Sequence, residues 1–166
     1  MNRSARIALV FGGLMLGVSS PALAQTATAN LNVSASVANK CTITTSAVSF
    51  GAYDPVVDHA STPLDGTGSV IVACTKGATG TRIDLGQGSH YSGGRRMQAG
   101  TEFLSYELYS NSGRTTVWGS GAGNGLGLTP APSSAPRTFD VYGRIPAAQD
   151  VGVGSYSDVV VATINF

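Results

Sequence analysis

Residues 27–37 read ATANLNVSASV, a stretch in which every odd-numbered residue is apolar and every even-numbered residue is polar. Because successive side chains of a β-strand point to opposite faces, this alternation predicts a strand with one apolar and one polar face. At about 3.3 Å per residue the strand would reach about 36 Å, which is long for a small domain. The pattern leaves open whether the apolar face packs within its own domain or against a neighbouring molecule.

The residues before this stretch have the pattern of an export signal. Arg3 and Arg6 form a basic start, residues 7–18 are apolar, and Ala22-Leu23-Ala24 has the small-residue spacing of a cleavage site. Since a bilayer-spanning helix needs about 20 apolar residues, this run predicts a signal peptide over residues 1–24 and no retained membrane span. We therefore expect an exported mature chain over residues 25–166.

The composition favours an extracellular β-protein. Charged residues make up 11% of the chain, against about 25% in an average globular protein, and small residues such as glycine, serine and alanine are abundant. Removal of Arg3 and Arg6 leaves eight basic and nine acidic residues, a net charge of −1. This balance gives no reason to expect nucleic acid or a membrane surface as a partner.

Cys41 and Cys74 are the two cysteines of the chain. In an exported protein they are expected to form one disulfide, although two buried free thiols are an alternative. By closing the loop between the two cysteines, the bond would stabilise the fold by about 4 kcal/mol on the chain-entropy model. Two cysteines without a Cys-x-x-Cys spacing, together with only two histidines, do not predict a metal site.

Short β-branched or apolar runs, separated by glycine, proline and other turn residues, recur through the rest of the chain. They predict strands over residues 40–44, 48–50, 69–74, 82–85, 103–109, 115–118, 137–143 and 156–166. The strands at 103–109 and 115–118 are expected to form a hairpin. Residues 56–68, 86–100 and 119–136 are expected to be loops. No segment has a sustained helical period, so the sequence predicts an all-β fold, an antiparallel β-sandwich.

Motifs of catalysis and ligand binding are missing from the sequence. The glycine run over residues 119–127 lacks the Gly-Lys-Ser/Thr ending of a phosphate loop, and no helix pattern follows it. His59 and His90 lie in polar, turn-like segments and are expected at the surface, and Arg95-Arg96 is expected in a solvated turn. We predict no catalytic residue, no cofactor and no metal ligand, and therefore no enzyme.

The last predicted strand repeats the alternation of the first, because Val160, Ala162, Ile164 and Phe166 share one face. A sheet edge with an apolar face is normally covered. A sandwich that lacks one strand can instead accept an extended segment from a partner, which pairs through main-chain hydrogen bonds. Residues 27–35 have the required form. The apolar side chains of this candidate donor strand are Ala27, Ala29, Leu31, Val33 and Ala35.

Several blocks of residues carry a resemblance to a known family. They are the alternating arm that leads into Cys41, FGAYDP over residues 50–55, LSYELY over residues 104–109 with Arg114 and VWG at 117–119, and VYGRIP over residues 141–146 followed by GSYSD over 154–158 and a strand ending at Phe166. On these residues the chain resembles the spore coat protein U domain family, the fold of archaic (Csu-type) chaperone–usher pilins. One departure is Ala147-Ala148-Gln149, where we would expect a glycine after the first alanine.

The resemblance implies an incomplete immunoglobulin-like antiparallel β-sandwich completed by a donated strand. Residues 25–36 would be the donor strand and residues 37–166 the pilin domain. Val160, Ala162, Ile164 and Phe166 would line the acceptor edge. The resemblance also implies three partners: a periplasmic chaperone, an outer-membrane usher and neighbouring pilin subunits in a homopolymer or heteropolymer. The expected location is the cell surface or a fimbrium, in support of adhesion or biofilm formation.

Two classes of function therefore stand side by side. The first is a structural pilus subunit, and the single domain favours a shaft or minor subunit. The second is a monomeric secreted carbohydrate-binding or spore-coat module, in which the N-terminal strand belongs to its own sheet.

Overall fold

The N-terminal arm is extended and exposed. A computed structural model describes residues 23–166 of the chain, which divides into two units that meet between Ala35 and Ser36. Residues 23–35 form no helix or strand, and all their side chains are exposed, Leu31 at 88% and Val33 at 86%. The strand predicted over residues 27–37 therefore has no sheet partner within the described residues.

Most of the predicted signal peptide, residues 1–24, lies outside the described residues, and only its last two residues are described. Within residues 23–166, no helix is long and apolar enough to cross a membrane.

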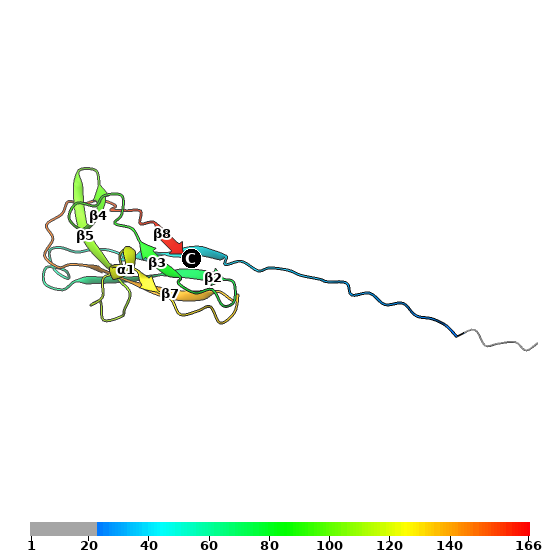
Figure 1. The fold of residues 1–166 in the computed structure, drawn as a ribbon. Helices are drawn as coiled ribbons and strands as arrows, with labels where there is room; N and C mark the ends of the chain where they lie inside the picture. Colours follow the sequence, from blue (N-terminus) through cyan, green and yellow to red (C-terminus); the bar gives the residue numbers. More distant parts are fainter. Residues whose placement is uncertain (1–22) are drawn as a thin grey trace, which may run out of the picture. The chain divides into compact units, whose positions relative to one another are not determined.

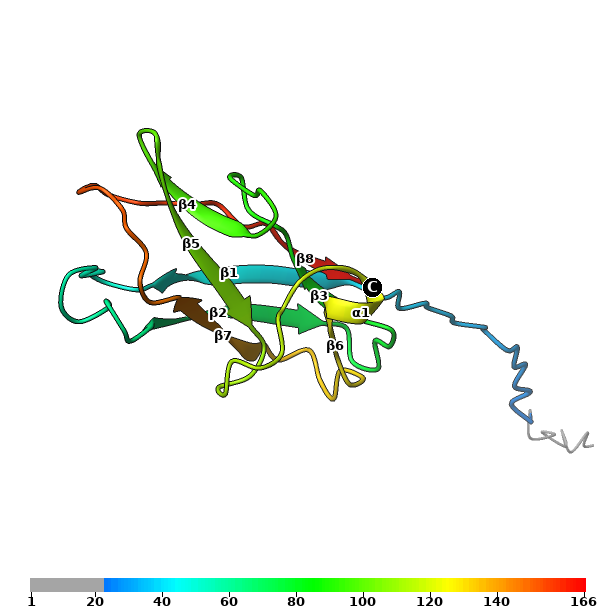
Figure 2. The same ribbon diagram turned by 90° about the vertical axis from the view of Figure 1, so that its left-hand side faces the viewer.

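The second unit contains a five-stranded antiparallel sheet with the strand order β1-β2-β7-β5-β4. The strands are β1 (Cys41–Ser49), β2 (Leu64–Cys74), β7 (Arg137–Ile145), β5 (Glu102–Tyr109) and β4 (Arg95–Ala99). Figure 2 shows β1, β2 and β7 side by side.

A second, three-stranded antiparallel sheet has the order β6-β3-β8. It consists of β6 (Leu126–Gly127), β3 (Arg82–Leu85) and β8 (Ala162–Asn165), and the short helix α1 (Gly121–Asn124) precedes β6. Figure 1 shows β3 beside β8. The prediction of an all-β antiparallel fold is confirmed, while its completion by a donated strand stays a prediction.

The core is formed by every second side chain along the strands. The buried side chains of the strands include Val70, Val72, Ile83, Leu85, Leu104, Tyr106, Leu108, Val141 and Ile145. Trp118 is the largest fully buried side chain, and its indole Nε1 donates a hydrogen bond of 3.0 Å to the carbonyl of Ile83. Because the indole N–H has this partner, the ring is buried without leaving a polar group unsatisfied.

Three segments predicted as loops contain strands: residues 56–68 include the start of β2, residues 86–100 contain β4, and residues 119–136 contain β6 and the short helix α1. Gly66 and Gly68 suggested a turn, but both lie in β2. A Cβ at Gly66 would lie 2.8 Å from Cδ1 of Phe50, and one at Gly68 would lie 2.8 Å from the backbone of Ala47. These glycines therefore allow β1 and the residue after it to approach β2 closely, and they do not break the strand.

The second misread segment contains β4. Arg95 was expected in a solvated turn, but its side chain is only 5% exposed and pairs with Glu107 on β5. Its guanidinium also donates to the carbonyls of Leu85, Gly86 and Trp118. A buried arginine with this many partners stabilises the fold without an unpaired charge.

Two further strand predictions hold only in part. Of the predicted strand at 156–166, only β8 is regular. The hairpin predicted between residues 103–109 and 115–118 is reduced to a single bridge between Tyr109 and Val117.

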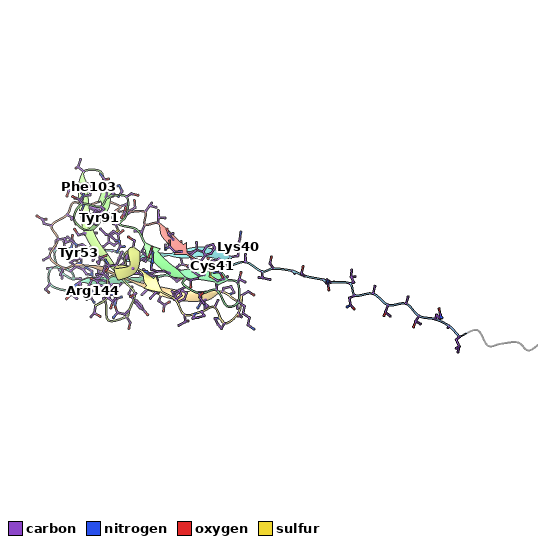
Figure 3. The ribbon with its side chains drawn as sticks, viewed as in Figure 1. Lys40, Cys41, Tyr53, Tyr91, Phe103 and Arg144 are labelled. Carbon is purple, nitrogen blue, oxygen red and sulfur yellow. A yellow bond between two sulfur atoms is a disulfide. The ribbon has the colours of Figure 1, made fainter. Side chains whose placement is uncertain are left out.

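The predicted disulfide is present. Cys41 and Cys74 are bonded, and they are direct partners in the antiparallel register of β1 and β2. The bond joins residues 33 positions apart. It fixes the start of β1 against the end of β2, at the point where the chain enters the domain (Figure 3).

The Ala147-Ala148-Gln149 turn places an alanine in a backbone conformation that favours glycine. Ala148 has a φ of 61°, in the left-handed region, and its N–H donates 2.9 Å to the carbonyl of His59. The glycine expected at this turn would adopt this conformation without the steric cost that a Cβ adds.

We therefore expect Ala148→Gly to raise the free energy of unfolding by about 0.5–1 kcal/mol, the cost of the left-handed alanine less the added chain entropy of glycine. Urea denaturation followed by Trp118 fluorescence measures the change. Ala147→Gly is the matched control, since Ala147 does not have a positive φ, and it should not stabilise the protein. A destabilised Ala148→Gly variant would contradict the prediction.

Candidate functional site

Within residues 23–166 the two sheets end in four edge strands, β1 and β4 in one and β6 and β8 in the other. β1 is the last strand on one side of the five-stranded sheet, and β8 is the last strand of the three-stranded sheet. The two strands lie close to each other, and Figure 2 shows them running in opposite directions. The gap between the β1 edge and the C-terminal segment before β8 is the candidate site.

An apolar groove occupies this gap. One cavity of about 380 Å³ lies between residues 45–48 of β1 and residues 158–162 of the C-terminal segment. A second cavity of about 700 Å³ continues between residues 48–55 and 151–156. Val48, Phe50 and Met97 line both cavities, so the two adjoin there and together form the groove.

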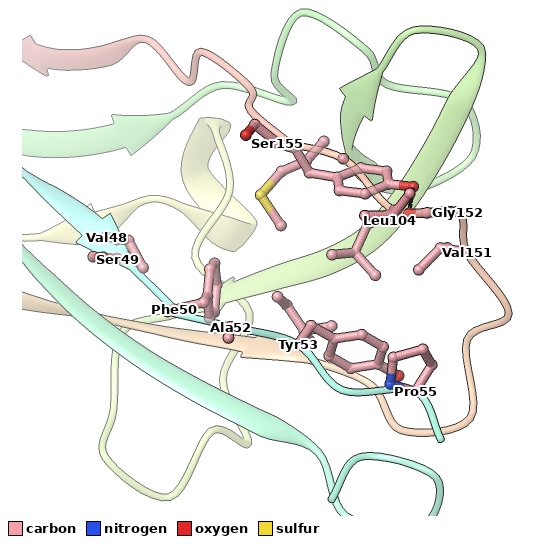
Figure 4. Close-up of a pocket in the computed structure, with 16 residues that line it drawn as sticks. Val48, Ser49, Phe50, Ala52, Tyr53, Pro55, Leu104, Val151, Gly152 and Ser155 are labelled. Atoms are coloured by element: carbon pink, nitrogen blue, oxygen red, sulfur yellow. Dashed lines mark hydrogen bonds between the residues drawn. The ribbon is translucent and has the colours of Figure 1, made fainter. Parts of the chain in front are cut away.

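The floor of the groove is formed by core side chains. In the smaller cavity it includes Val70, Leu85, Tyr106, Leu108 and Val141, which are all buried. In the larger cavity, Phe50 and Tyr53 on one side and Leu104 on the other are directed into the space, as Figure 4 shows. An apolar side chain placed here would leave water for a packed apolar surface, which is the main favourable term in association.

The main chain of the C-terminal segment can pair with a further strand. Gly86 N–H donates 2.8 Å to the carbonyl of Val161, and Ser89 N–H donates 3.1 Å to that of Val159. Along an extended chain, successive residues direct their N–H and C=O groups to opposite sides. Val160 therefore directs its main-chain groups to the other side, where no backbone partner occurs within the described residues.

Only two of the four predicted acceptor residues line the groove. Val160 and Ala162 line the smaller cavity. Ile164 packs partly buried against the core opposite Ile83, and Phe166 is 54% exposed; neither lines the groove. The groove therefore lies further towards residue 151 than the acceptor edge predicted from sequence.

Several groove residues have no counterpart in the sequence prediction. They are Val48, Phe50, Tyr53, Met97, Leu104, Tyr106 and Tyr156. The alternation of residues 103–109 indicates an inward Leu104 and Tyr106. Met97 gives no such signal, because the glycine-rich, polar pattern of residues 86–100 predicts a loop.

A buried carboxylate lies beside the smaller cavity. The side chain of Asp158 is 2% exposed. It accepts hydrogen bonds from Tyr106 Oη at 2.7 Å, from the backbone N–H of Ser89 at 2.9 Å and from that of His90 at 3.3 Å, and it lies 3.1 Å from His90 Nδ1. His90, expected as a surface residue, is therefore part of this cluster.

These contacts determine the protonation state of the cluster. Burial would raise the pKa of Asp158, but its hydrogen bonds from Tyr106 and from three backbone N–H groups together lower it below the ordinary value. Burial raises the pKa of Tyr106, and the adjacent Asp158 raises it further. The pair is thus an ionised carboxylate and a neutral phenol at neutral pH.

The second predicted surface histidine has a local structural role. The His59 ring stacks on Tyr53 with ring centroids 5.0 Å apart, and its Nδ1 accepts a hydrogen bond from Asp54 N–H at 3.0 Å. Within residues 23–166, no group of three or more His, Cys, Asp or Glu side chains is placed to hold a metal ion.

Comparison with protein families gives a match over most of the chain. The family model described as Spore Coat Protein U domain matches residues 27–163. The chain belongs to the spore coat protein U domain family. The match begins in the arm and ends within β8, so it includes both the candidate donor strand and the groove. This family is structural, in agreement with the prediction that the chain is no enzyme.

Relatives support this assignment. The chain is 42% identical over 175 residues to "Protein U" of Myxococcus xanthus, and the match covers 96% of each protein. Its fold is similar to a chain in the crystal structure of the CsuC–CsuE chaperone–tip adhesion subunit pre-assembly complex from archaic chaperone–usher Csu pili of Acinetobacter baumannii. There the TM-score is 0.56 at 24% identity, over 78% of this chain and 40% of that chain.

A third comparison is more distant. The Escherichia coli Hda pilus minor tip subunit HdaB matches with a TM-score of 0.41 and 15% identity, over 74% of this chain and 79% of that chain.

Two aspartates, Asp84 and Asp158, make the stability of the fold sensitive to acid. The hydrogen bond and ion pair with Arg82 lower the pKa of Asp84 below the ordinary 3.8, as the contacts above do for Asp158. Since each folded-state pKa is below the unfolded one, the ionised carboxylates stabilise the fold at neutral pH, and this stabilisation is lost as the pH falls below about 4.

We expect the free energy of unfolding, measured by urea denaturation, to decrease as the pH is lowered from about 5 to about 3. Asp84→Asn should be less stable at the higher pH and should show a smaller decrease. Asp140→Asn, which removes an exposed aspartate, is the control for a general effect of charge. An Asp84→Asn variant with the full wild-type decrease would contradict the assignment.

Proposed function

We propose that this protein is a structural subunit of a surface fibre that polymerises by donor-strand exchange. The observation that carries the proposal is the apolar groove between two sheet edges without partners. The arm, residues 27–35, has the alternation that a strand inserted there needs, and its apolar side chains are exposed in the chain by itself.

The energies are of the right order for a stable assembly. Burial of Leu31 and Val33 would contribute about 3–6 kcal/mol before ordering costs, and main-chain hydrogen bonds along the groove would add to it. The three alanines contribute less but fit shallow positions. Because the arm and the groove are different surfaces of one chain, insertion of one into the other is heterologous and extends into an open filament.

The partners of the proposal follow from this exposed groove. A groove that is open before assembly requires temporary cover, and a periplasmic chaperone would supply it until an outer-membrane usher exchanges it for the arm of the next subunit. The likeness to a chain of a chaperone–subunit complex supports this step. The fibre would lie at the cell surface, where adhesion or biofilm formation is its expected use.

The membership in a spore coat family supports a second use of the same assembly. Polymers of this domain would then form part of a spore coat in place of a pilus. The arm and the groove would work in the same way in both cases.

The first test changes the arm. Leu31→Asp combined with Val33→Asp places two charges where apolar side chains would enter the groove, and we expect the loss of multimers. Asn30→Asp combined with Ser34→Asp adds the same two charges on the polar face and should keep them. Size-exclusion chromatography and a gel of unheated protein measure the multimers. Equal behaviour of the two double variants would reject the arm as donor.

The second test changes the groove and identifies the direction of donation. Val160→Asp combined with Ala162→Asp should abolish multimers, whereas Val159→Asp with Val161→Asp, on the exposed side of the same segment, should not. A mixture of the arm variant and the groove variant has one intact arm and one intact groove. It should form a 1:1 dimer and nothing longer. Multimers of the groove variant alone would reject the groove as the acceptor, and a monomeric wild type would overturn the proposal in favour of a monomeric binding module.

A further inference from the structure

The segment before β8 forms one wall of the groove without being part of a regular sheet. Between Tyr156 and β8 it makes a two-way bridge from Ser157 to Gln98, with distances of 2.9 and 3.2 Å. Its carbonyl at Val161 accepts one hydrogen bond, from Gly86 N–H, and its carbonyl at Val159 accepts two, from the N–H and the hydroxyl of Ser89. Residues 158–161 therefore depend on other contacts for their extended conformation. Those contacts also decide whether Val160 faces the groove.

Asp158 adds further contacts to this segment through its side chain. Its carboxylate joins three parts of the domain: the segment itself, the loop over residues 86–90 and β5. The loop contributes the two backbone N–H groups of Ser89 and His90, and β5 contributes the hydroxyl of Tyr106. Hydrogen bonds to a buried, ionised acceptor are stronger than those between neutral groups.

The loop is shaped to bring its N–H groups to this carboxylate. Gly88 has a φ of 90°, and a Cβ built on it would lie 2.0 Å from Asp158 Oδ2. Any other residue there would displace the carboxylate or the loop. The glycine thus serves the contact with Asp158, and the polar, glycine-rich segment that sequence reading left as a plain connection has a defined partner.

We propose that Asp158 is a positioning residue for strand acceptance, which holds the C-terminal segment extended so that Val160 and its main-chain groups face the groove. The inference rests on the proposed function, since it gives the groove wall a role in receiving a strand. Both carboxylate oxygens are engaged by Ser89, His90 and Tyr106 of the same domain, so Asp158 acts through the segment that it holds.

The chain offers a matched control pair. Tyr142 Oη donates to Asp140 Oδ2 at 3.3 Å on β7, in an exposed position. This pair has the same chemistry as Tyr106 and Asp158 but does not line the groove. Asp158→Asn and Tyr106→Phe are therefore the test variants, and Asp140→Asn and Tyr142→Phe are their controls.

The test uses the full-length arm variant, whose own arm cannot donate, and a fluorescent peptide of residues 25–37. We expect Asp158→Asn and Tyr106→Phe each to raise the dissociation rate of the peptide about tenfold, the effect of one lost hydrogen bond to a charged group. The two controls should stay within about twofold of the parent. A wild-type dissociation rate in folded Asp158→Asn and Tyr106→Phe would overturn the proposal.

Hydrogen exchange of the full-length chain separates this inference from the proposed function. Asp158→Asn should raise exchange about tenfold in residues 86–90 and 157–161 but not in β2, whereas Asp140→Asn should change neither. If the parent binds no peptide, the proposed function fails and exchange alone decides about the role of Asp158. If exchange in Asp158→Asn is unchanged, or is raised equally throughout the domain, Asp158 does not specifically hold this segment, and the inference is overturned. Tyr106→Phe, which removes one oxygen, gives the same readout if Asp158→Asn does not fold.

Discussion

The rest of the structure depends on the unpaired main chain along two sheet edges. Backbone N–H and C=O groups have to find partners in protein or water, and an edge that is buried without them is costly. β1 and the C-terminal segment leave such groups facing a groove with an apolar floor. The groove can be filled favourably only by a segment that offers main-chain groups and apolar side chains together, which is the combination that an alternating extended strand provides.

A domain with an open groove needs its walls held by contacts on other sides. The disulfide fixes the start of β1 to β2, and the glycines of β2 let β1 lie close against it. On the other wall, the Arg95 guanidinium satisfies carbonyls of β3 and of the residues around it, and Asp158 holds the segment before β8. Each wall of the groove is therefore held to the body of the domain by contacts on its other side.

Local patterns were enough to predict the class of the fold, and the errors lie where distant residues decide. The alternation of β5 and the β-branched run in β2 identified strands because each encodes its own buried face. Gly66 and Gly68 were read as a turn, since the sequence does not show that Phe50 and Ala47 lie over them. Arg95 and His90 were read as solvated, since Glu107 and Asp158 are distant in the chain. The larger cavity has no sequence signal for the same reason, because it depends on Met97, Leu104 and Tyr53, which three separate segments bring together.

The geometry of the two edges constrains any strand that fills the gap. β1 and β8 run in opposite directions (Figure 2), so an inserted strand is parallel to one edge and antiparallel to the other. Antiparallel pairing is slightly more stable per residue, but neither edge is uniform: the β1–β2 register shifts between Ser46 and Ser49, beside the groove, and the opposite wall is regular only within β8. The two edges therefore offer short runs of good pairing and not one long ladder. Side chains in the cavities must then supply much of the binding energy, and an inserted strand that slips by one residue would turn its apolar face to solvent. The strict alternation of residues 27–37 is suited to this constraint, because every second residue along its whole length can face the groove.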